Sequence, residues 1–277
     1  MISSDMDDLM RLKDAEGWNQ LEEDWELLIN YEKSINLVAI QDDHIVGSIT
    51  AINYDSTVIW IGMMLVAQGY RGRGISKLLL YDMIEKSNKF SSIKLDATPA
   101  GKPVYLKLGF VDEKRLFRMT NPSFSALVPK TRNPTPVLIT HQDLPEVISL
   151  DKLIFGAGRS ELINRLYQRY PELAWLIRER GKITGFCMGR RGQNFTQIGP
   201  AHASSEIGAK ALIRSAGNQL TGQPVVVDIH ADKPEVKKWL EGNGFRSQRT
   251  FERMFLKNNT YPGIKEYQYL ICGPELG

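Results

Sequence analysis

The sequence predicts a mixed α/β fold with two domains in tandem, each a mixed and mostly antiparallel sheet flanked by helices. Three features of the 277 residues support this prediction. The chain is longer than a single compact core usually requires. A proline-rich segment divides it near the middle, and the same order of elements, with several short motifs, occurs on both sides of that segment.

The first half predicts a helical stretch, then hairpin strands, then alternating helix and strand. The polar and amphipathic residues 5–34 are typical of helix, and turns at Asp42–Asp43 and Asp55–Ser56 separate the strands that follow. Hairpins followed by alternating elements indicate a mixed sheet. The expected elements are strands at 36–41, 44–54 and 57–66, a helix at 74–87, a strand at 93–98, a short helix at 100–108 and a strand at 112–120.

The second half predicts the same order of elements, so we expect two separate sheets, one after the other. Its tail, 267–277, carries strand-like residues and is expected to add a closing strand. The other expected elements are helices at 143–151 and 158–170, strands at 173–178, 183–190 and 194–199, a helix at 205–219, a strand at 225–230, a helix at 233–242 and a strand at 246–256.

The domain boundary is expected where four prolines stand within fifteen residues, at 122, 129, 134 and 136. Neither a helix interior nor a central strand accepts proline at this density. We therefore expect a first domain at 1–125, a linker at 126–136 and a second domain at 137–277.

Short motifs recur in the same order in the two halves. In each, an aspartate ends an apolar strand, a glycine then precedes a phenylalanine, and an arginine–methionine pair begins nine residues after that glycine. Several matches in one order favour a duplicated domain over chance. The paired positions are Asp96 and Asp228, Gly109 and Gly244, and Arg118 and Arg253.

The composition indicates a globular protein of low net charge. Hydrophobic residues make up 42% and charged residues 24%, and 35 Lys and Arg against 32 Asp and Glu give a net charge of +3. No block of like charge occurs, so we expect neither a nucleic-acid nor a membrane partner. The most apolar run, 58–67, is about half as long as a membrane span requires.

The acidic start of the chain resembles neither a signal nor a transit peptide, so a cytoplasmic location is expected. Cys187 and Cys272 have neither the number nor the spacing of a disulfide framework or a metal site, and we expect no metal.

A loop rich in glycine and arginine lies between an expected strand and an expected helix. The strand that ends at Val66 leads into residues 67–76 (AQGYRGRGIS), and a helix follows from Lys77. Glycines let successive backbone N–H groups turn toward one point, and a helix start adds partial positive charge, so this geometry suits a phosphate. Arg71 and Arg73 strengthen the positive charge.

Two common phosphate loops do not fit these residues. A nucleoside triphosphate P-loop requires lysine after its last glycine, but Ile75 follows Gly74. A Rossmann fingerprint requires a third glycine where Lys77 stands. The loop instead resembles the acyl-CoA pyrophosphate loop of the GNAT superfamily of N-acetyltransferases, whose signature is Q/R-x-x-G-x-G/A. Ser76 stands at its last position.

A second segment strengthens this resemblance. Residues 100–110 (AGKPVYLKLGF) are similar to the GNAT segment A-x-x-x-Y-x-K-L-G-F, in which the tyrosine commonly lies near the cofactor sulfur. The resemblance implies acetyl-CoA as cosubstrate and Tyr105 as the catalytic acid. It also implies that the strand ending at Val66 splays from the next strand and offers backbone N–H groups to the acyl carbonyl and the pantetheine arm. The cofactor-binding residues that it implies are Leu65, Val66, Arg71, Gly72, Arg73, Gly74, Ile75 and Ser76.

The second half lacks this machinery. Its counterpart loop, 202–208, has no arginine and one glycine, and Leu240 stands where the first half has Tyr105. We expect a degenerate copy that shapes the acceptor pocket. Asp96, Asp228 and His230 are candidates for binding the substrate, although strand-end carboxylates can instead bond to loop N–H groups and a lone histidine is more often structural.

The expected function is transfer of an acetyl group from acetyl-CoA to a primary amine of a small molecule, by direct attack in a ternary complex. The acceptor's identity, the general base and the oligomeric state stay open. Two alternatives remain: a non-catalytic acyl-CoA-binding regulatory protein, and a lysine acetyltransferase that acts on proteins. A small acceptor is favoured because a second domain on a short linker would narrow the cleft.

Overall fold

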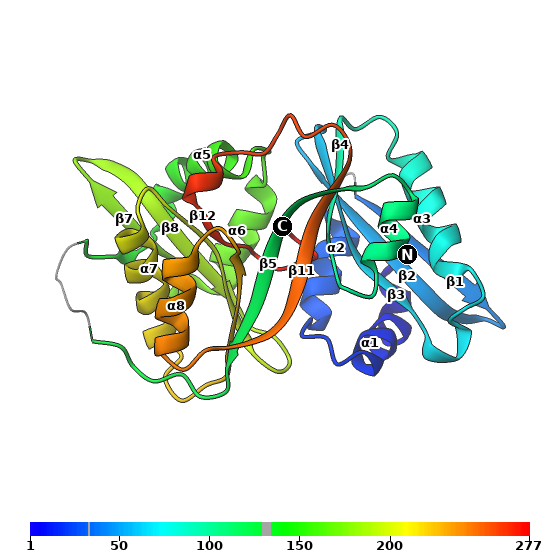
Figure 1. Cartoon of the computed structure of the whole chain (residues 1–277), viewed down its shortest axis with the longest axis horizontal. Coiled ribbons are helices and arrows are strands. Elements are labelled where there is room, and N and C mark those ends of the chain that lie inside the picture. The colour runs from blue at the N-terminus through cyan, green and yellow to red at the C-terminus, as the bar shows by residue number, and fades with distance from the viewer. Residues whose placement is uncertain (33, 129–133) are drawn as a thin grey trace.

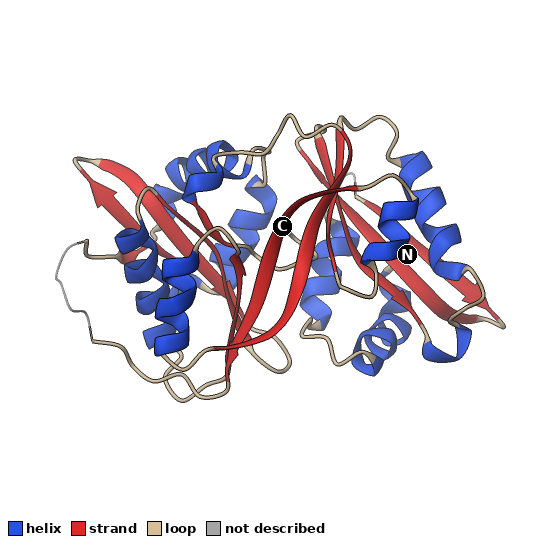
Figure 2. Ribbon diagram, in the orientation of Figure 1, coloured by secondary structure: helices blue, strands red, loops and turns tan. Residues whose placement is uncertain are grey.

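The computed structural model describes residues 1–32, 34–128 and 134–277, so residues 129–133 of the expected linker lie outside the described residues. Twelve strands form one continuous sheet through both halves, in the order β1-β2-β3-β4-β11-β5-β10-β12-β9-β8-β7-β6. Helices flank the sheet (Figure 2). The mixed α/β fold is confirmed, but the prediction of two separate sheets is wrong.

The first half contains every element that its sequence predicts. The long helical stretch is two helices, because Gly17 adopts a positive φ of 62° and stops the first. The helices are α1 (Met6–Ala15), α2 (Glu22–Asn30), α3 (Ile75–Lys86) and α4 (Lys102–Lys107), and the strands are β1 (Ile35–Gln41), β2 (His44–Tyr54), β3 (Val58–Val66), β4 (Ser92–Ala97) and β5 (Val111–Asn121).

The second half also follows its prediction, with one added strand, β6 (Val137–Leu138), too short for a pattern to reveal. The closing strand expected in the tail is confirmed as β12 (Gln268–Leu270), which pairs with two neighbours. The other elements are α5 (Leu144–Phe155), α6 (Ser160–Arg169), β7 (Trp175–Glu179), β8 (Lys182–Arg190), β9 (Thr196–Ala203), α7 (Glu206–Asn218), β10 (Val225–His230), α8 (Pro234–Gly242) and β11 (Arg246–Lys257).

The two halves exchange strands at the centre of the sheet. Strand β11 of the second half lies between β4 and β5 of the first, and β5 lies between β11 and β10. Figure 1 shows β5 and β11 side by side between the two halves. Neither half therefore completes its sheet alone, and the break between separate sheets that the linker suggested does not occur.

Alternation along the strands places separate helices on the two faces of the first half. Ile52 and Tyr54 of β2 pack in one buried cluster with α1 and α2, whereas Ile49 and Ala51 pack in another with α3 and α4. Side chains alternate between faces of a strand, so α1 and α2 cover one face and α3 and α4 the other.

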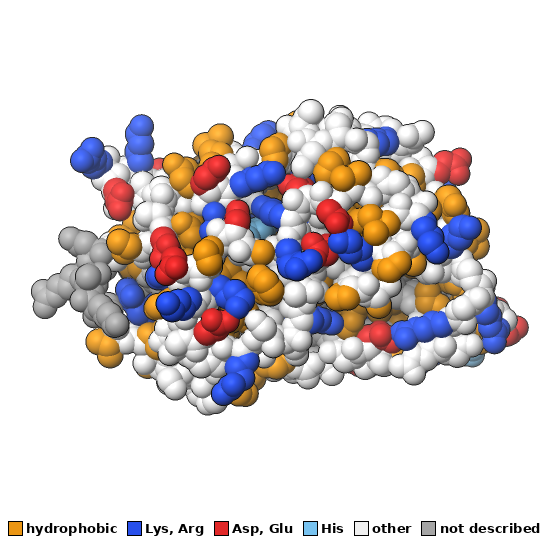
Figure 3. All heavy atoms as spheres, in the orientation of Figure 1, with side chains coloured by type: hydrophobic (Ala, Val, Ile, Leu, Met, Phe, Trp, Pro, Cys, Tyr) orange, Lys and Arg blue, Asp and Glu red, His pale blue; other side chains and the backbone are white. Residues whose placement is uncertain are grey.

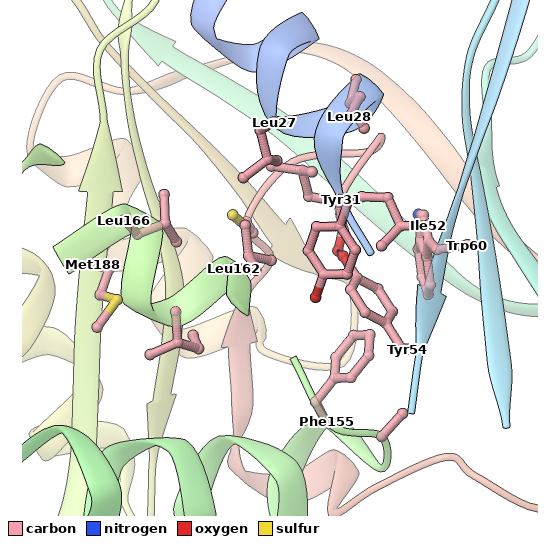
Figure 4. Packing of buried hydrophobic residues seen from close by; sticks show 14 of the residues in the cluster. Leu27, Leu28, Tyr31, Ile52, Tyr54, Trp60, Phe155, Leu162, Leu166 and Met188 are labelled. Carbon is pink, nitrogen blue, oxygen red and sulfur yellow. Dashed lines mark hydrogen bonds between the residues drawn. The ribbon is translucent and has the colours of Figure 1, made fainter. Parts of the chain in front are cut away.

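The face with α1 and α2 shares its core with the second half. Tyr54 and Trp60 of the first half make tilted or edge-on ring contacts with Phe155 of the second, with centroids 5.5 and 5.8 Å apart. Figure 4 shows these rings together with Leu162 and Met188. Aromatic burial of this extent makes the interface between the halves part of one hydrophobic core.

The tail beyond β12 is buried in this interface. The hydroxyl of Tyr54 donates to the carbonyl oxygen of Leu276 at 2.7 Å, and the indole N–H of Trp60 donates to that of Pro274 at 2.9 Å. Gly62 of β3 packs so closely against Glu275 that a Cβ there would lie 2.8 Å from its Cα. The tail thus reaches the middle of the first half.

On the face shown in Figure 3, basic and acidic side chains are interspersed over both halves. None of the helices in the described residues has the length and apolar character needed to cross a membrane.

Candidate active site

The site begins where β3 separates from β4. The two parallel strands pair from Val58 with Ser92 to Ile61 with Leu95, and then the pairing stops. Met63 follows with a positive φ of 46°, and the hydroxyl of Ser48 on β2 donates to its carbonyl oxygen at 3.0 Å. The irregular backbone bends the end of β3, as in a β-bulge, and opens a space between the strands. The splay implied by the family resemblance is present.

The glycine loop connects the open end of β3 to α3. Gly72 and Gly74 have φ values of 78° and 83°, a left-handed conformation that L side chains rarely adopt. Apart from the adjacent residues in the chain, no atom of the described residues lies within 4 Å of the position that a Cβ would take at either glycine. The loop backbone is therefore accessible in front of the N-terminus of α3, where backbone N–H groups and the helix dipole favour an anion.

Two arginines of the loop have different surroundings. The Nε of Arg71 donates to the carbonyl oxygen of Val66 at 3.2 Å, and its guanidinium forms an ion pair with Glu16 at the end of α1. Arg73 lies over the ring of Tyr70, 5.0 Å from its centroid. Arg71 is thus held beside the end of β3, with half of its side chain still exposed to solvent.

Tyr105 lies on α4, across the space from the splayed strand. Its side chain is buried and contacts the ring of Phe110, with centroids 5.7 Å apart. Its hydroxyl forms no hydrogen bond within the described residues. Burial raises the pKa of Tyr105 to about 12, so the phenol keeps its proton at neutral pH.

One cavity of about 560 Å³ joins these features. The residues that line it include the end of β3, the glycine loop and Tyr105. The cavity also reaches side chains that sequence reasoning did not select. These are Glu16, Trp18 and Gln20 after α1, Arg118 on β5, Arg249 and Phe251 on β11, and Pro274 and Glu275 in the tail.

Of the eight predicted cofactor-binding residues, seven line this cavity, and Arg73 does not. The residues that the sequence missed come from the segment after α1, from β5, from β11 and from the tail. Of these, only Arg118 belongs to a repeated motif, which could have drawn attention to it. The residues on β11 and in the tail reach the cavity because the halves exchange strands and the tail inserts between them, an arrangement that no local sequence pattern indicates.

The two candidate aspartates bind arginines. Both carboxylate oxygens of Asp96 accept from Arg253, at 2.8 and 2.9 Å, and both of Asp228 accept from Arg118, at 2.8 and 2.7 Å. Gln197 also donates to Asp228, at 3.1 Å. Asp96 lines the cavity, whereas Asp228 is fully buried and is not among the lining residues, although its partner Arg118 is. Both carboxylates are thus engaged by arginines, and the role of either aspartate in binding substrate stays a prediction.

His230 is also away from the cavity. It is buried on β10, opposite Leu116 of β5, and its Nδ1 has no hydrogen-bond partner within the described residues. Burial, together with the nearby charges of Lys114 and Arg253, holds the pKa of His230 well below its usual range. The structure buries this histidine in the core, outside the lining of the cavity, and its role in binding substrate stays a prediction.

The second half repeats the backbone of the site without its functional side chains. Leu240 occupies the place of Tyr105, and in both halves the backbone N–H of the following phenylalanine, Phe245 or Phe110, donates to this residue's carbonyl oxygen at 3.1 Å. At the start of α7, Ser205 caps the helix by accepting from Gly208. A serine side chain thus fills the position that a phosphate could occupy.

Comparisons with known proteins agree with this geometry. Residues 11–124 and residues 147–270 each match a family model described as an acetyltransferase (GNAT) domain. Holothin acyltransferase from Pseudoalteromonas sp. (strain SANK 73390) is 27% identical over 219 residues, which are 77% of this chain and 72% of that protein.

Two solved structures share the fold over nearly the whole chain. A putative acetyltransferase from Pyrococcus horikoshii superposes with a TM-score of 0.81 at 22% identity, covering 100% of this chain and 94% of that one. A tandem GNAT protein from the clavulanic acid biosynthesis pathway superposes with a TM-score of 0.58 at 12% identity, covering 93% and 95%. The chain belongs to the GNAT acetyltransferases, and it is an acyltransferase with two GNAT domains in tandem.

Proposed function

We propose that the protein is an N-acetyltransferase that moves the acetyl group of acetyl-CoA to a primary amine of a small molecule. The observation that carries this proposal is the single cavity, which is lined by the glycine loop, the splayed strand, Tyr105 and side chains of the second half. A cosubstrate bound on the loop and an acceptor bound toward the second half would meet beside Tyr105. Direct attack in a ternary complex follows from that arrangement.

The first half supplies the cofactor site in this proposal. Open backbone N–H groups at Gly72 and Gly74, the start of α3 and the guanidinium of Arg71 suit a pyrophosphate. The hydroxyl of Ser76 adds a donor in the first turn of the helix. The splayed end of β3, at Leu65 and Val66, offers backbone groups to the pantetheine arm.

The chemistry requires no covalent enzyme intermediate. A neutral amine attacks the thioester carbonyl and a C–N bond forms; the C–S bond then breaks, and the proton that the nitrogen loses passes to water. Tyr105 delivers a proton to the departing sulfur. Its raised pKa keeps the phenol protonated at neutral pH, so that the proton is present when the sulfur leaves. Both thiols, Cys187 and Cys272, are buried and outside the cavity lining, and burial raises their pKa values, so neither suits a nucleophile.

The second half shapes the acceptor side in this proposal. Leu240 and Ser205 stand where a second cofactor site would need a general acid and an open loop. Strand β11 and the tail instead contribute Arg249, Phe251 and Glu275 to the cavity of the first half. An acceptor that fits among these side chains is small, which favours a metabolite over a lysine on a protein surface.

The test is a panel of primary amines with acetyl-CoA, followed by detection of released CoA thiol and of the N-acetyl product by mass spectrometry. We expect turnover with a subset of small amines. Binding of CoA without turnover on any small amine or protein would instead establish the non-catalytic alternative. Acetylation confined to protein lysines would establish the protein-directed alternative. A matched Tyr105→Phe preparation controls for uncatalysed acetylation.

A further inference from the structure

Two arginines stand directly opposite each other where β11 pairs with β5. Arg249 and Arg118 are register partners, so their side chains share one face of the sheet. Both guanidinium groups lie against the ring of Phe251, at 5.2 and 5.1 Å from its centroid. Both arginines line the cavity. Like charges in this position destabilise a sheet unless counter-charges accompany them.

Only one of the two has a counter-charge. Arg118 binds Asp228 through two hydrogen bonds. Arg249 forms no ion pair or hydrogen bond within the described residues, and its Nε is buried without an acceptor. Burial and the charge of Arg118 lower the pKa of Arg249 from its usual value. The cavity wall therefore contains a partly buried guanidinium that forms no ion pair or hydrogen bond with the described residues, although the charges of Asp228 and Glu275 act on it electrostatically.

The duplicated domain shows the same arrangement with every group satisfied. Arg253 on β11 stands opposite Lys114 on β5, as Arg118 stands opposite Arg249. Arg253 binds Asp96 as Arg118 binds Asp228, and Lys114 donates to Oε1 of Gln268 at 2.8 Å. In this pair the second cation, Lys114, therefore has a hydrogen-bond partner, which β12 supplies. In the pair of Arg118 and Arg249, the corresponding cation is Arg249, which lines the cavity and has no such partner within the described residues.

The remaining acid beside this arginine is already engaged. Glu275 lines the cavity, but its Oε1 accepts from Arg190, which also donates to Asp24 at 2.6 Å. Asp96 likewise gives both oxygens to Arg253. A guanidinium prefers a carboxylate because two parallel N–H groups match two oxygens.

We propose that the acceptor amine carries a carboxylate and that Arg249 binds it, with Arg118 beside it. This inference rests on the proposed function and specifies its substrate class: amino acids or other amino carboxylic acids. The carboxylate anchors the acceptor on β11. This part of the cavity wall comes from the second half of the chain, whereas the glycine loop comes from the first half. Its amine then extends toward Tyr105 and the thioester.

The test compares matched acceptors that differ only at the carboxylate, such as glycine with glycinamide and 4-aminobutyrate with 4-aminobutanamide. In the full chain, we expect the kcat/KM of the preferred amino acid to exceed that of its amide at least 10-fold. Arg249→Gln should lower kcat/KM for the acid about 10- to 100-fold, mainly through KM, which is the range for a lost charge-assisted contact. Values for the amide and for acetyl-CoA should not change.

Two further variants sharpen the result. Arg249→Lys should keep part of the preference, since it keeps the charge but loses the paired N–H groups. Arg246→Gln, an exposed arginine on the same strand, is the matched control and should change nothing. Arg249→Gln should unfold at the same or a higher temperature, because it removes a like-charge contact. A structural role for Arg249 predicts a lower unfolding temperature instead.

The outcomes separate this inference from the proposed function. Turnover of amides and acids at equal kcat/KM would overturn the inference and leave the acetyltransferase intact. A raised KM for acetyl-CoA in Arg249→Gln, or a preference for succinyl-CoA that this variant abolishes, would assign Arg249 to the acyl donor. If no amine is acetylated, calorimetry can still test the carboxylate site. It compares the affinities of the CoA-bound protein for N-acetylglycine and N-acetylglycinamide, and equal affinities would refute the site.

Discussion

Asp96 and Arg253 form a bidentate ion pair between the two halves of the chain, 157 residues apart in sequence. Asp228 and Arg118 form the reciprocal pair, again with one partner from each half. Each aspartate lies on a strand of one domain copy, β4 or β10, and binds the arginine of the other copy. The two ion pairs thus follow from the exchange of β5 and β11. They also stabilise this exchange, because separating the strands would leave buried charges unpaired, which strongly destabilises the fold.

The exchange predicts that neither half folds alone. Fragment 1–128 lacks β11, which leaves Asp96 without Arg253 and β4 with only one of its two neighbours, β3. We expect this fragment to be unfolded or aggregated by circular dichroism and size exclusion. Coexpression with fragment 134–277 should restore a soluble, cooperative complex. A monomeric fragment 1–128 with a sharp unfolding transition would show that strand exchange is dispensable.

Tyr105→Phe tests the general acid. Expelling a thiolate is easier when a proton is delivered to it, so we expect kcat to fall about 10- to 1000-fold while the affinity for CoA changes little. Steady-state kinetics and calorimetry measure the two quantities. Tyr81→Phe, on the exposed face of α3, is the matched control. A folded Tyr105→Phe enzyme with full kcat would remove the phenol from the mechanism.

Arg71→Glu tests the pyrophosphate site. It replaces a cation beside the glycine loop with a group that repels both phosphate and Glu16, and the affinity for CoA should weaken by about 2 to 3 kcal/mol. Arg191→Glu is a close control, because Arg191 is similarly exposed and also pairs with a glutamate, Glu172. Calorimetry on the unmodified chain should give one CoA per chain. A stoichiometry of two would reveal a working site in the second half.

The elements and the cofactor loop could be predicted because their signals are local. Turns at Asp42–Asp43 and Asp55–Ser56 bound β2, a helical pattern indicates α3, and closely spaced glycines indicate the loop at Gly72 and Gly74. The motifs repeated between the halves supported the prediction of the same order of helices and strands in the second half. These signals depend on neighbours in sequence, so the patterns specify the elements without the tertiary structure.

The pairing between halves could not be predicted in this way. Nothing in the sequence near Arg253 distinguishes a partner in its own half from Asp96 in the other, because two copies of one domain offer equivalent partners. His230 and Asp228 therefore seemed suited to a pocket in the second half, yet exchange of β5 buries both. The role of Arg249 depends on the same exchange, since only that pairing brings it to the cavity of the first half.

Gly62→Ala tests the tail that reaches into the site. A Cβ at Gly62 would lie 2.8 Å from both Cα and Cβ of Glu275, a distance that forces the tail away from β3. We expect a loss of about 1 to 3 kcal/mol in the free energy of unfolding and a higher KM for the acceptor, since Glu275 lines the cavity. Gly69→Ala is the control, with no atom within 4 Å of its Cβ position.

His230 provides a prediction for the dependence of stability on pH. Burial, and then the charges of Lys114 and Arg253, hold its pKa well below 6.5 in the folded state, whereas the unfolded chain regains the ordinary value. As pH falls below about 6.5, the unfolded state binds a proton that the folded state does not, so stability is lost. One such group contributes a slope of up to about 1.4 kcal/mol per pH unit.

Urea unfolding at pH 7.5, 6.5 and 5.5 measures this slope, and His230→Gln should reduce it because glutamine binds no proton. His202 is also buried with a lowered pKa, so part of the slope should remain in that variant. His44→Gln, at an exposed position where β2 begins, is the matched control. An unchanged slope in His230→Gln would mean that this histidine is already protonated, or accessible to protons, in the folded protein. That result would favour the prediction that His230 can contact a substrate.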